Sequence, residues 1–246
     1  MEDFKFYEVG GKIRDELLGL TNKDIDYVAV PTNELLSKGY TAEEMFKLLY
    51  TDLAIEKFEI FLVTPECYTI RAKFPEGYKY QGVADFVMAR KEVGYIPGTR
   101  TPIVEPGNLY DDLSRRDFTV NAMAKDPDTS EIIDYFDGKR DLAHMCLRTP
   151  LDTETTFNDD PLRILRAIRF KITKNFLFDS DLDAGIMYYP YEEKMKIVSE
   201  ERIREELVKC FKHSTHKTLQ VLETYDSLRD YIFKYTNLWL KPTNEK

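Results

Sequence analysis

Two aspartates, two positions apart, open a stretch rich in β-branched residues. Asp24 and Asp26 begin the segment that runs to Val30, and its alternation predicts a strand. Residues two apart on a strand point to the same face, so both carboxylates project together. Neighbouring carboxylates repel each other unless a cation lies between them. A hard divalent ion such as Mg²⁺, which prefers oxygen ligands, is the natural candidate.

A glycine pair precedes these aspartates. Gly10 and Gly11 open a predicted helix over residues 12–18, and backbone amides at such a turn form a phosphate site. Lys12 and Arg14 lie beside the turn and carry charge that would neutralise phosphate. A lone glycine pair is more often an ordinary turn, and a lone Asp-x-Asp a solvated strand end. Together and in this order, they fit nucleotidyl transfer.

Asp85 is a third acidic candidate. It lies in the apolar segment 83–88, where burying an unpartnered charge would be costly. A position at the edge of a strand is therefore favoured over the interior. The alternative is an ordinary strand residue that faces solvent.

A second group of polar residues follows, made of Arg115, Arg116, Asp117 and Asn121. Arginine forks match phosphate oxygens, and Asp or Asn side chains bind ribose hydroxyls. The alternative is a helix start with a buried apolar face over residues 118–123, and both interpretations can hold.

A third group lies on a helix predicted to begin at Pro161. Asp160 and Arg163 then fall within one turn and share a face. A carboxylate accepts from the exocyclic amine of cytosine or adenine, and an arginine donates to the ring acceptors. The alternative for Asp160 is a simple N-cap. Arg166 and Arg169 continue the series.

The elements that must position these groups change character along the chain. Strand and helix patterns alternate first, with a helix over 33–47 and strands over 58–64 and 83–89. In the first strand, Phe58, Ile60 and Leu62 are expected on one face. Residues 94–107 form a Pro- and Gly-rich loop. An α+β (α/β) domain with a mixed sheet over residues 1–141, followed by an all-helical domain over 142–246, is predicted.

The ordered motifs resemble those of the class II tRNA nucleotidyltransferases. This family includes the CCA-adding enzymes and bacterial-type poly(A) polymerases, within the DNA polymerase β-like superfamily. The resemblance covers roughly residues 5–212. Its motifs lie at residues 9–15, 24–26, 85–86, 90–92, 112–124, 134–138, 159–170 and 199–203.

The resemblance implies a nucleotidyltransferase head, a helical neck and a shortened C-terminal body. In the head, Asp24 and Asp26 would bind two metal ions, and Asp85 would be the third carboxylate. The block 115–121 would hold the triphosphate and sense the ribose. Because the family repeats the arginine at position 14, an ordinary exposed charge is a better account of Lys12 than of Arg14.

In the helical part, the resemblance makes Asp160 and Arg163 a protein template that selects C and A. The family's leading glutamate is Asp159 here, a conservative departure. One of Arg166 and Arg169 is expected to face the triphosphate, and the other to be solvated or ion-paired. The loop 94–107 is the segment that the family uses to switch from C to A.

Composition and charge are compatible with these expectations but do not establish them. The hydrophobic content of 43% and aromatic content of 13% argue against disorder. Residues 161–246 carry 16 Lys and Arg against 13 Asp and Glu, although the whole chain has a net charge of −9. The later half is thus mildly basic, which is compatible with RNA but is not a strong basic patch. Three scattered cysteines and the lack of a long apolar run predict a reducing, cytoplasmic location and no membrane partner.

The expected activity is Mg²⁺-dependent, template-independent transfer from CTP and ATP to the 3′ end of RNA, most simply tRNA. A poly(A) polymerase and a partial CC- or A-adding enzyme are alternatives. From another class, a catalytically silent nucleotide- or RNA-binding module is the remaining alternative.

Overall fold

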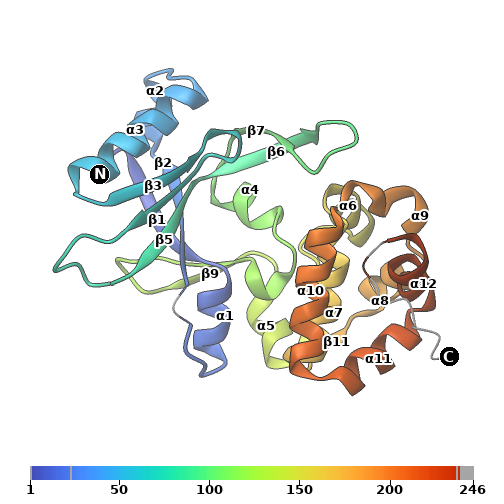
Figure 1. Ribbon diagram of the computed structural model, residues 1–246. Coiled ribbons are helices and arrows are strands. Elements are labelled where there is room, and N and C mark those ends of the chain that lie inside the picture. The colour runs from blue at the N-terminus through green and yellow to red at the C-terminus, as the bar shows by residue number, and fades with distance from the viewer. Residues whose placement is uncertain (1, 23, 237, 239–246) are drawn as a thin grey trace. The chain divides into compact units, whose positions relative to one another are not determined.

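The computed structural model describes residues 2–22, 24–236 and 238. By internal contacts the chain divides into two compact units (Figure 1). The head unit comprises Met1–Ile96 and Thr101–Leu142, and the helical unit comprises Pro97–Arg100 and Ala143–Lys246. The predicted class, an α+β head with a mixed sheet followed by a helical region, is confirmed.

The head unit is built on a seven-stranded sheet of order β3-β4-β5-β2-β1-β8-β9. Only β2 and β5 pair in parallel, and the other neighbours are antiparallel. The strands span Phe4–Val9 (β1), Ile25–Pro31 (β2), Glu59–Thr64 (β3), Thr69–Lys73 (β4), Val83–Met88 (β5), Met123–Lys125 (β8) and Ile132–Asp134 (β9).

Two helices cover one face of this sheet, α2 (Asn33–Ser37) and α3 (Ala42–Ile55) (Figure 1). Leu49 and Leu53 of α3 are fully buried in a core with Ile70 and Phe86 of the strands. The single helix predicted over 33–47 is wrong. The left-handed backbone of Gly39 (φ 72°) ends the first helix, and a capping box starts the second.

The other head elements are short. They are α1 (Gly11–Leu17), β6 (Arg90–Tyr95), β7 (Pro102–Pro106), α4 (Leu109–Ser114) and α5 (Gly138–Ala143), with 3₁₀ turns at Pro65–Cys67 (η1) and Thr119–Asn121 (η2). The predicted loop over 94–107 is wrong for half of its residues, because β6 and β7 pair as an antiparallel ribbon over 94–95 and 102–106. Only residues 96–101 connect the two strands.

Strand β3 departs from regular alternation. Ile60 pairs with Ala72 and Leu62 pairs with Arg71, so Phe61 is an extra residue, a β-bulge. Phe58 and Ile60 pack against the core as expected. Leu62 does not, and 51% of its surface is exposed. The predicted common face of these three residues is therefore wrong at its third member.

The helical unit contains α6 (Thr153–Asp159), α7 (Leu162–Thr173), α8 (Ser180–Met187), α9 (Tyr191–Lys194), α10 (Glu200–His213), α11 (Thr215–Thr224) and α12 (Asp226–Tyr235), with a 3₁₀ turn at Met195–Ile197. Two short parallel strands, β10 (Cys146–Leu147) and β11 (Leu177–Phe178), complete it. Helices α7 and α10 lie side by side (Figure 1). Among the described residues, no helix is long and apolar enough to cross a membrane.

Candidate active site

The parallel pairing of β2 and β5 brings two of the predicted carboxylates together. Asp26 and Asp85 are register partners on adjacent strands, so their side chains share one face of the sheet. Asp24 immediately precedes β2. All three line a hollow of about 370 Å³ on the head. The other lining residues are Ile25, Phe61, Arg71, Val83 and Ala84.

The charges in this hollow are not balanced at Asp26. Burial raises the pKa of the Asp26 carboxyl, and the nearby charges of Asp85 and Asp24 raise it further. Arg116 and Arg71 act in the opposite direction but do not cancel the shift. The anionic form of Asp26 is therefore disfavoured until a further cation arrives.

Arg71 binds the third carboxylate, a contact that no sequence pattern predicts. Its Nε and Nη2 donate to the two oxygens of Asp85 at 2.7 and 2.8 Å. The two residues are register partners on β4 and β5. Arg71 sits in an ordinary polar–apolar alternation, and only the strand register identifies its partner.

The glycine turn lies against the same cluster. Gly10 has φ 78° and ψ −139°, a conformation open almost only to glycine. A Cβ built on Gly10 would lie 3.0 Å from Arg116 Nη1 and 3.7 Å from Asp26 Oδ2. The end of β1, strand β2 and the segment after α4 thus converge there. A guanidinium and a carboxylate therefore lie beside the backbone of the glycine turn.

A buried network of polar side chains lies next to the glycine turn. Arg14 Nη1 donates to Asn121 Oδ1 at 2.6 Å, and Asn121 Nδ2 donates to Asp117 Oδ1 at 2.8 Å. Arg14 also binds both oxygens of Asp15. The three predicted residues Arg14, Asp117 and Asn121 are therefore one hydrogen-bonded group, with Arg14 as its support.

Lys12 and Arg115 have other partners. Lys12 Nζ pairs with Glu8 at 2.9 Å and lies 4.2 Å from the centroid of the Tyr80 ring. Arg115 binds the fully buried Asp112 and lies 3.6 Å from Glu92. Burial raises the pKa of Asp112, but the charges of Arg115 and Arg116 outweigh burial and lower it overall. These contacts give Arg115 a structural role, and its predicted phosphate contact stays a prediction.

In the helical unit, Asp160 already has a partner. Arg100 Nε and Nη2 donate to its two oxygens, each at 2.6 Å. Asp160 Oδ1 also accepts from the Leu162 amide at 3.0 Å, at the start of α7, although the N-cap residue of this helix is Pro161 and not Asp160. The pair with Arg100 was missed, because the two residues are 60 positions apart and nothing in either segment points to the other.

Three arginines follow Asp160 along one face of α7. Arg163, Arg166 and Arg169 are all half-buried at three-residue spacing. Arg163 Nη1 donates to the Thr156 carbonyl at 3.2 Å. Arg169 pairs with Glu206 of α10 at 2.5 Å, and it is thus the ion-paired member that the sequence led us to expect.

The chain is similar to proteins of a known family. A family model described as the poly A polymerase head domain matches residues 6–148. The chain belongs to this family. A multifunctional CCA protein of Herminiimonas arsenicoxydans is 40% identical over 171 residues, which cover 68% of the chain and 34% of the relative.

Solved structures of CCA-adding enzymes agree with the family assignment. The Bacillus stearothermophilus enzyme in complex with CTP matches at a TM-score of 0.69 and 25% identity, covering 90% of the chain and 48% of that protein. The Thermotoga maritima enzyme complexed with tRNA matches at 0.69 and 26%, covering 98% and 50%. The chain therefore spans about a third to a half of the length of these relatives.

A metal ion fits the donor set of this family member. No group of three His, Cys, Asp or Glu side chains is already arranged around a metal position within the described residues. The three candidate donors are nevertheless all carboxylates, which suit Mg²⁺. Burial is the main cause of the raised pKa of Asp26, and a cation bound beside this carboxyl would favour its anionic form. Asp24 and Asp26 are the residues best suited to hold such an ion.

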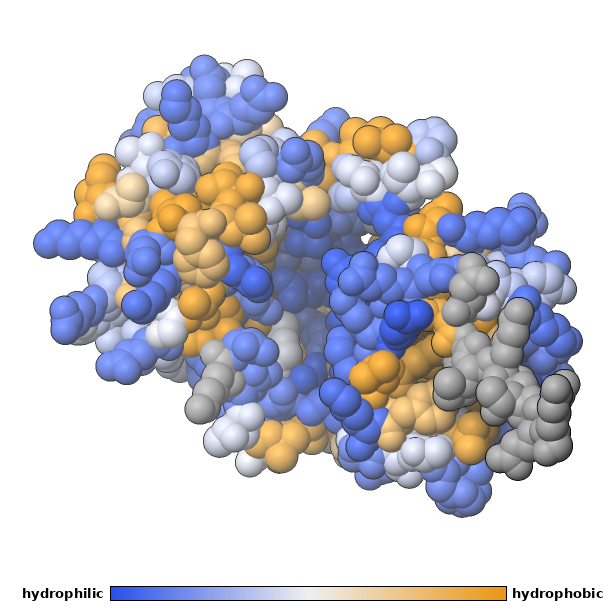
Figure 2. Space-filling view, in the orientation of Figure 1, coloured by the Kyte–Doolittle hydropathy of each residue, from blue (hydrophilic) through white to orange (hydrophobic). Residues whose placement is uncertain are grey.

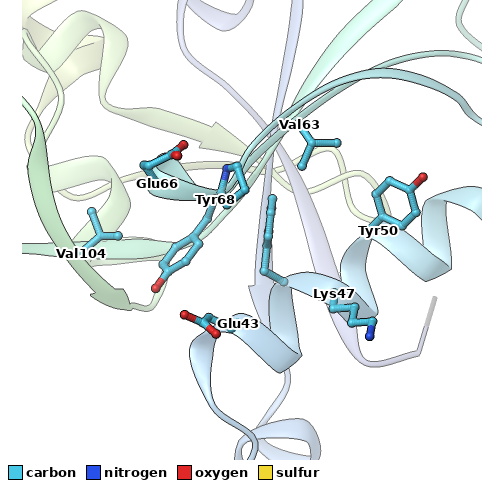
Figure 3. A pocket seen from close by; sticks show the side chains of 9 residues that line it. Glu43, Lys47, Tyr50, Val63, Glu66, Tyr68 and Val104 are labelled. Carbon is cyan, nitrogen blue, oxygen red and sulfur yellow. The ribbon is translucent and has the colours of Figure 1, made fainter.

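A larger cavity of about 590 Å³ lies elsewhere on the head, between α3 and the strands (Figure 3). The Tyr68 ring points toward Glu43 across it, with Lys47 and Tyr50 on the helix side. None of the carboxylates or arginines of the first site lines this cavity. A choice by cavity volume alone would have selected this cavity. We instead assign the candidate active site to the carboxylate hollow.

Proposed function

We propose that the chain is a metal-dependent, template-independent nucleotidyltransferase that adds nucleotides from CTP and ATP to the 3′ end of RNA, with tRNA as the main acceptor. One observation carries this proposal. Asp24, Asp26 and Asp85 share a hollow of the head. The Gly10 turn and Arg116 lie beside Asp26. Carboxylates for a metal and donors for a triphosphate are the two requirements of phosphoryl transfer.

Each group in the head has a distinct task. The amides of the Gly10 turn and the Arg116 guanidinium hold the triphosphate. Asp24 and Asp26 hold Mg²⁺, with Asp85 beside them. The chemistry that bound Mg²⁺ supplies is polarisation of the acceptor hydroxyl and of the phosphate oxygens. The reaction joins the acceptor 3′ oxygen to the α-phosphorus and releases pyrophosphate.

Asp117 and Asn121 recognise the ribose in this proposal. A rigid network is needed, because hydrogen-bonding groups discriminate best when their positions are fixed. The buried Arg14 supplies that rigidity through its 2.6 Å bond to Asn121. Loss of Arg14 would thus act through Asn121.

Asp160 and Arg163 select the base. The two donors of Arg100 occupy both oxygens of Asp160 in the ligand-free structure, which indicates that this carboxylate is oriented to accept N–H groups. The exocyclic amine of cytosine or adenine offers such a donor, whereas the keto oxygen of uracil does not. The amine of a base therefore competes with Arg100 for the oxygens of Asp160.

The relatives support the substrates. One solved structure contains CTP and another contains tRNA, and the Herminiimonas relative is named a CCA protein. A poly(A) polymerase is the second candidate, because the matched family model carries that description. The head groups described above serve either activity.

The test is an extension assay with the purified chain. A tRNA lacking its 3′ end is incubated with Mg²⁺ and each labelled NTP in turn, and the products are sequenced. We expect CTP and ATP to be incorporated, with no product when EDTA is present. A long adenosine tail, or equal use of an unstructured single strand, would favour the poly(A) polymerase. NTP binding without any incorporation would leave only the silent binding module.

A further inference from the structure

The β-bulge in β3 turns Leu62 away from the core, onto the face where Phe61 also lies. Ile60 and Val63 pair with the core residues Ala72 and Ile70, while Phe61 and Leu62 both lie opposite Arg71. Phe61 is 56% exposed. A regular strand would have turned Leu62 toward the core. Bulges of this kind redirect a side chain and are frequent beside active sites.

Phe61 lies on the carboxylate face, because it follows Ile60, which packs against the core on the other face. One cross-strand row runs from Leu62 on β3 to Arg71 on β4, Asp85 on β5 and Asp26 on β2. Register partners share a face of the sheet. Phe61 lines the same hollow as the three aspartates, and the surface over β3 carries hydrophobic residues among hydrophilic ones (Figure 2).

The two sides of the hollow differ in chemistry. On the β1 side are the Gly10 turn and Arg116, which suit a triphosphate. On the β3 side are Phe61 and the half-exposed Val83, with a guanidinium, Arg71, whose side chain is 47% exposed. Attacking and leaving oxygens lie roughly in line across the transferred phosphorus. The acceptor hydroxyl must therefore approach the carboxylates from the side opposite the leaving pyrophosphate.

We propose that Phe61 is the stacking platform for the 3′-terminal base of the acceptor RNA, so that β3 and β4 form the acceptor subsite. The inference rests on the proposed function and names where the acceptor binds. Every base has a π-face, so an aromatic platform accepts any terminal nucleotide. The exposed edge of Arg71 offers positive charge for the phosphate that precedes this nucleotide.

The experiment uses the full chain and an RNA minihelix of acceptor stem and T arm. Its last nucleotide is 2-aminopurine, whose fluorescence falls on stacking, and a 3′-deoxy end prevents transfer. We expect quenching with the wild-type chain, little with Phe61→Ala, and recovery with Phe61→Trp. In turnover with the extendable RNA, Phe61→Ala should raise the KM for RNA about tenfold, from typical base–aromatic stacking. The KM for CTP should change less than twofold.

Tyr50→Ala is the matched control. Tyr50 is an exposed aromatic residue that lines the other cavity, beyond the opposite face of the sheet. It should leave quenching and both KM values at wild-type levels. Phe61→Leu separates stacking from general apolar contact and should lose most of the quenching. Unfolding midpoints of all variants identify any loss of fold.

The outcomes separate this inference from the proposed function. Transfer with equal quenching and equal RNA KM in wild type and Phe61→Ala overturns the stacking role alone. Quenching that depends on Phe61 without any incorporation supports the subsite and overturns the transferase proposal. A wild-type chain that binds no RNA overturns both. A change of oligomeric state in Phe61→Ala would identify Phe61 as a contact between copies and overturn the inference.

Discussion

The two candidate sites of the chain treat their key aspartates in opposite ways. In the head unit, Asp26 has two carboxylate neighbours, and its pKa is raised by burial and by their charge. In the helical unit, both oxygens of Asp160 are bound by a single guanidinium, Arg100. Asp26 is buried beside two other carboxylates, whereas Asp160 has a bidentate cationic partner.

The difference follows from what each site is proposed to bind. A site for a metal ion gains affinity from negative charge that the protein leaves uncompensated. A site that reads a neutral base must not hold a free buried charge, so an internal cation has to occupy it between turnovers. Substitutions at the carboxylates of the head should therefore lower the rate of transfer. Substitutions at the base-reading site should instead weaken the selectivity for the nucleotide.

The largest effect is expected at the carboxylate pair. Asp26→Ala or Asp24→Ala should lower kcat by about 10³-fold or more, because metal-assisted charge stabilisation is worth several kcal/mol. The measurement is single-nucleotide extension at saturating CTP and Mg²⁺. Asp52→Ala, a carboxylate on α3 outside the hollow, serves as the control. Near-normal turnover in either variant would remove the metal assignment.

A smaller effect is expected at the base-reading pair, and in a different parameter. Asp160→Ala and Arg163→Ala should lower the preference for CTP over UTP by about 100-fold. In the wild type a wrong base leaves a polar group of the site without a hydrogen-bond partner, and this penalty is lost when the polar group is removed. The ratio of kcat/KM values for the four NTPs measures this. If both variants keep the wild-type ratio, Asp160 has only its structural role at the start of α7.

The contrast also shows what the sequence reveals and what it does not. Asp24, Asp26 and Gly10 were predicted to lie together, because strand periodicity and a glycine turn are local signals. Their proximity is confirmed by the structure, while their catalytic roles remain proposals. Arg71 was missed, because its partner is set by the register between β4 and β5. A register depends on the whole sheet and leaves no trace within one strand.

The wrong predictions about the fold also concern features that residue periodicity alone does not reveal. The single range predicted over 33–47 overlooked Gly39, although a left-handed residue followed by the cap at Thr41 ends one helix and starts another. The expected common face of Phe58, Ile60 and Leu62 failed at the bulge. No residue type demands a bulge at this point, so alternation alone could not place Leu62 on the same face as Phe61.

A modest effect is expected when the internal cation of the helical unit is removed. Arg100→Gln should lower the KM for CTP about two- to fivefold, because a partly exposed ion pair is worth up to about 1 kcal/mol and the base no longer competes with it. Steady-state kinetics with CTP measure the change, with Lys91→Gln on β6 as the control. A rise in KM would mean that Arg100 itself contacts the nucleotide.

The smallest effect is expected in stability, and it distinguishes the two aspartates directly. An aspartate whose pKa is raised in the folded protein keeps its proton to higher pH than in the unfolded chain. The folded state therefore gains stability as the pH falls through the raised pKa and loses it as the pH rises. The Asp26→Asn side chain does not ionise, so this variant does not lose stability as the pH rises. At pH 7 in EDTA its Tm should therefore exceed the wild-type value by about 1–3 °C.

Two further measurements complete this prediction. The difference between Asp26→Asn and wild type should shrink as the pH falls, because the raised pKa lets the folded wild-type protein bind this proton more readily than the unfolded chain. Added Mg²⁺ should raise the wild-type Tm more than that of Asp26→Asn, because binding to the folded state stabilises it. Asp160→Asn should behave oppositely and lower the Tm in EDTA, since it leaves Arg100 without its anionic partner. Equal responses of the two variants would show that the charge contrast between the sites does not exist.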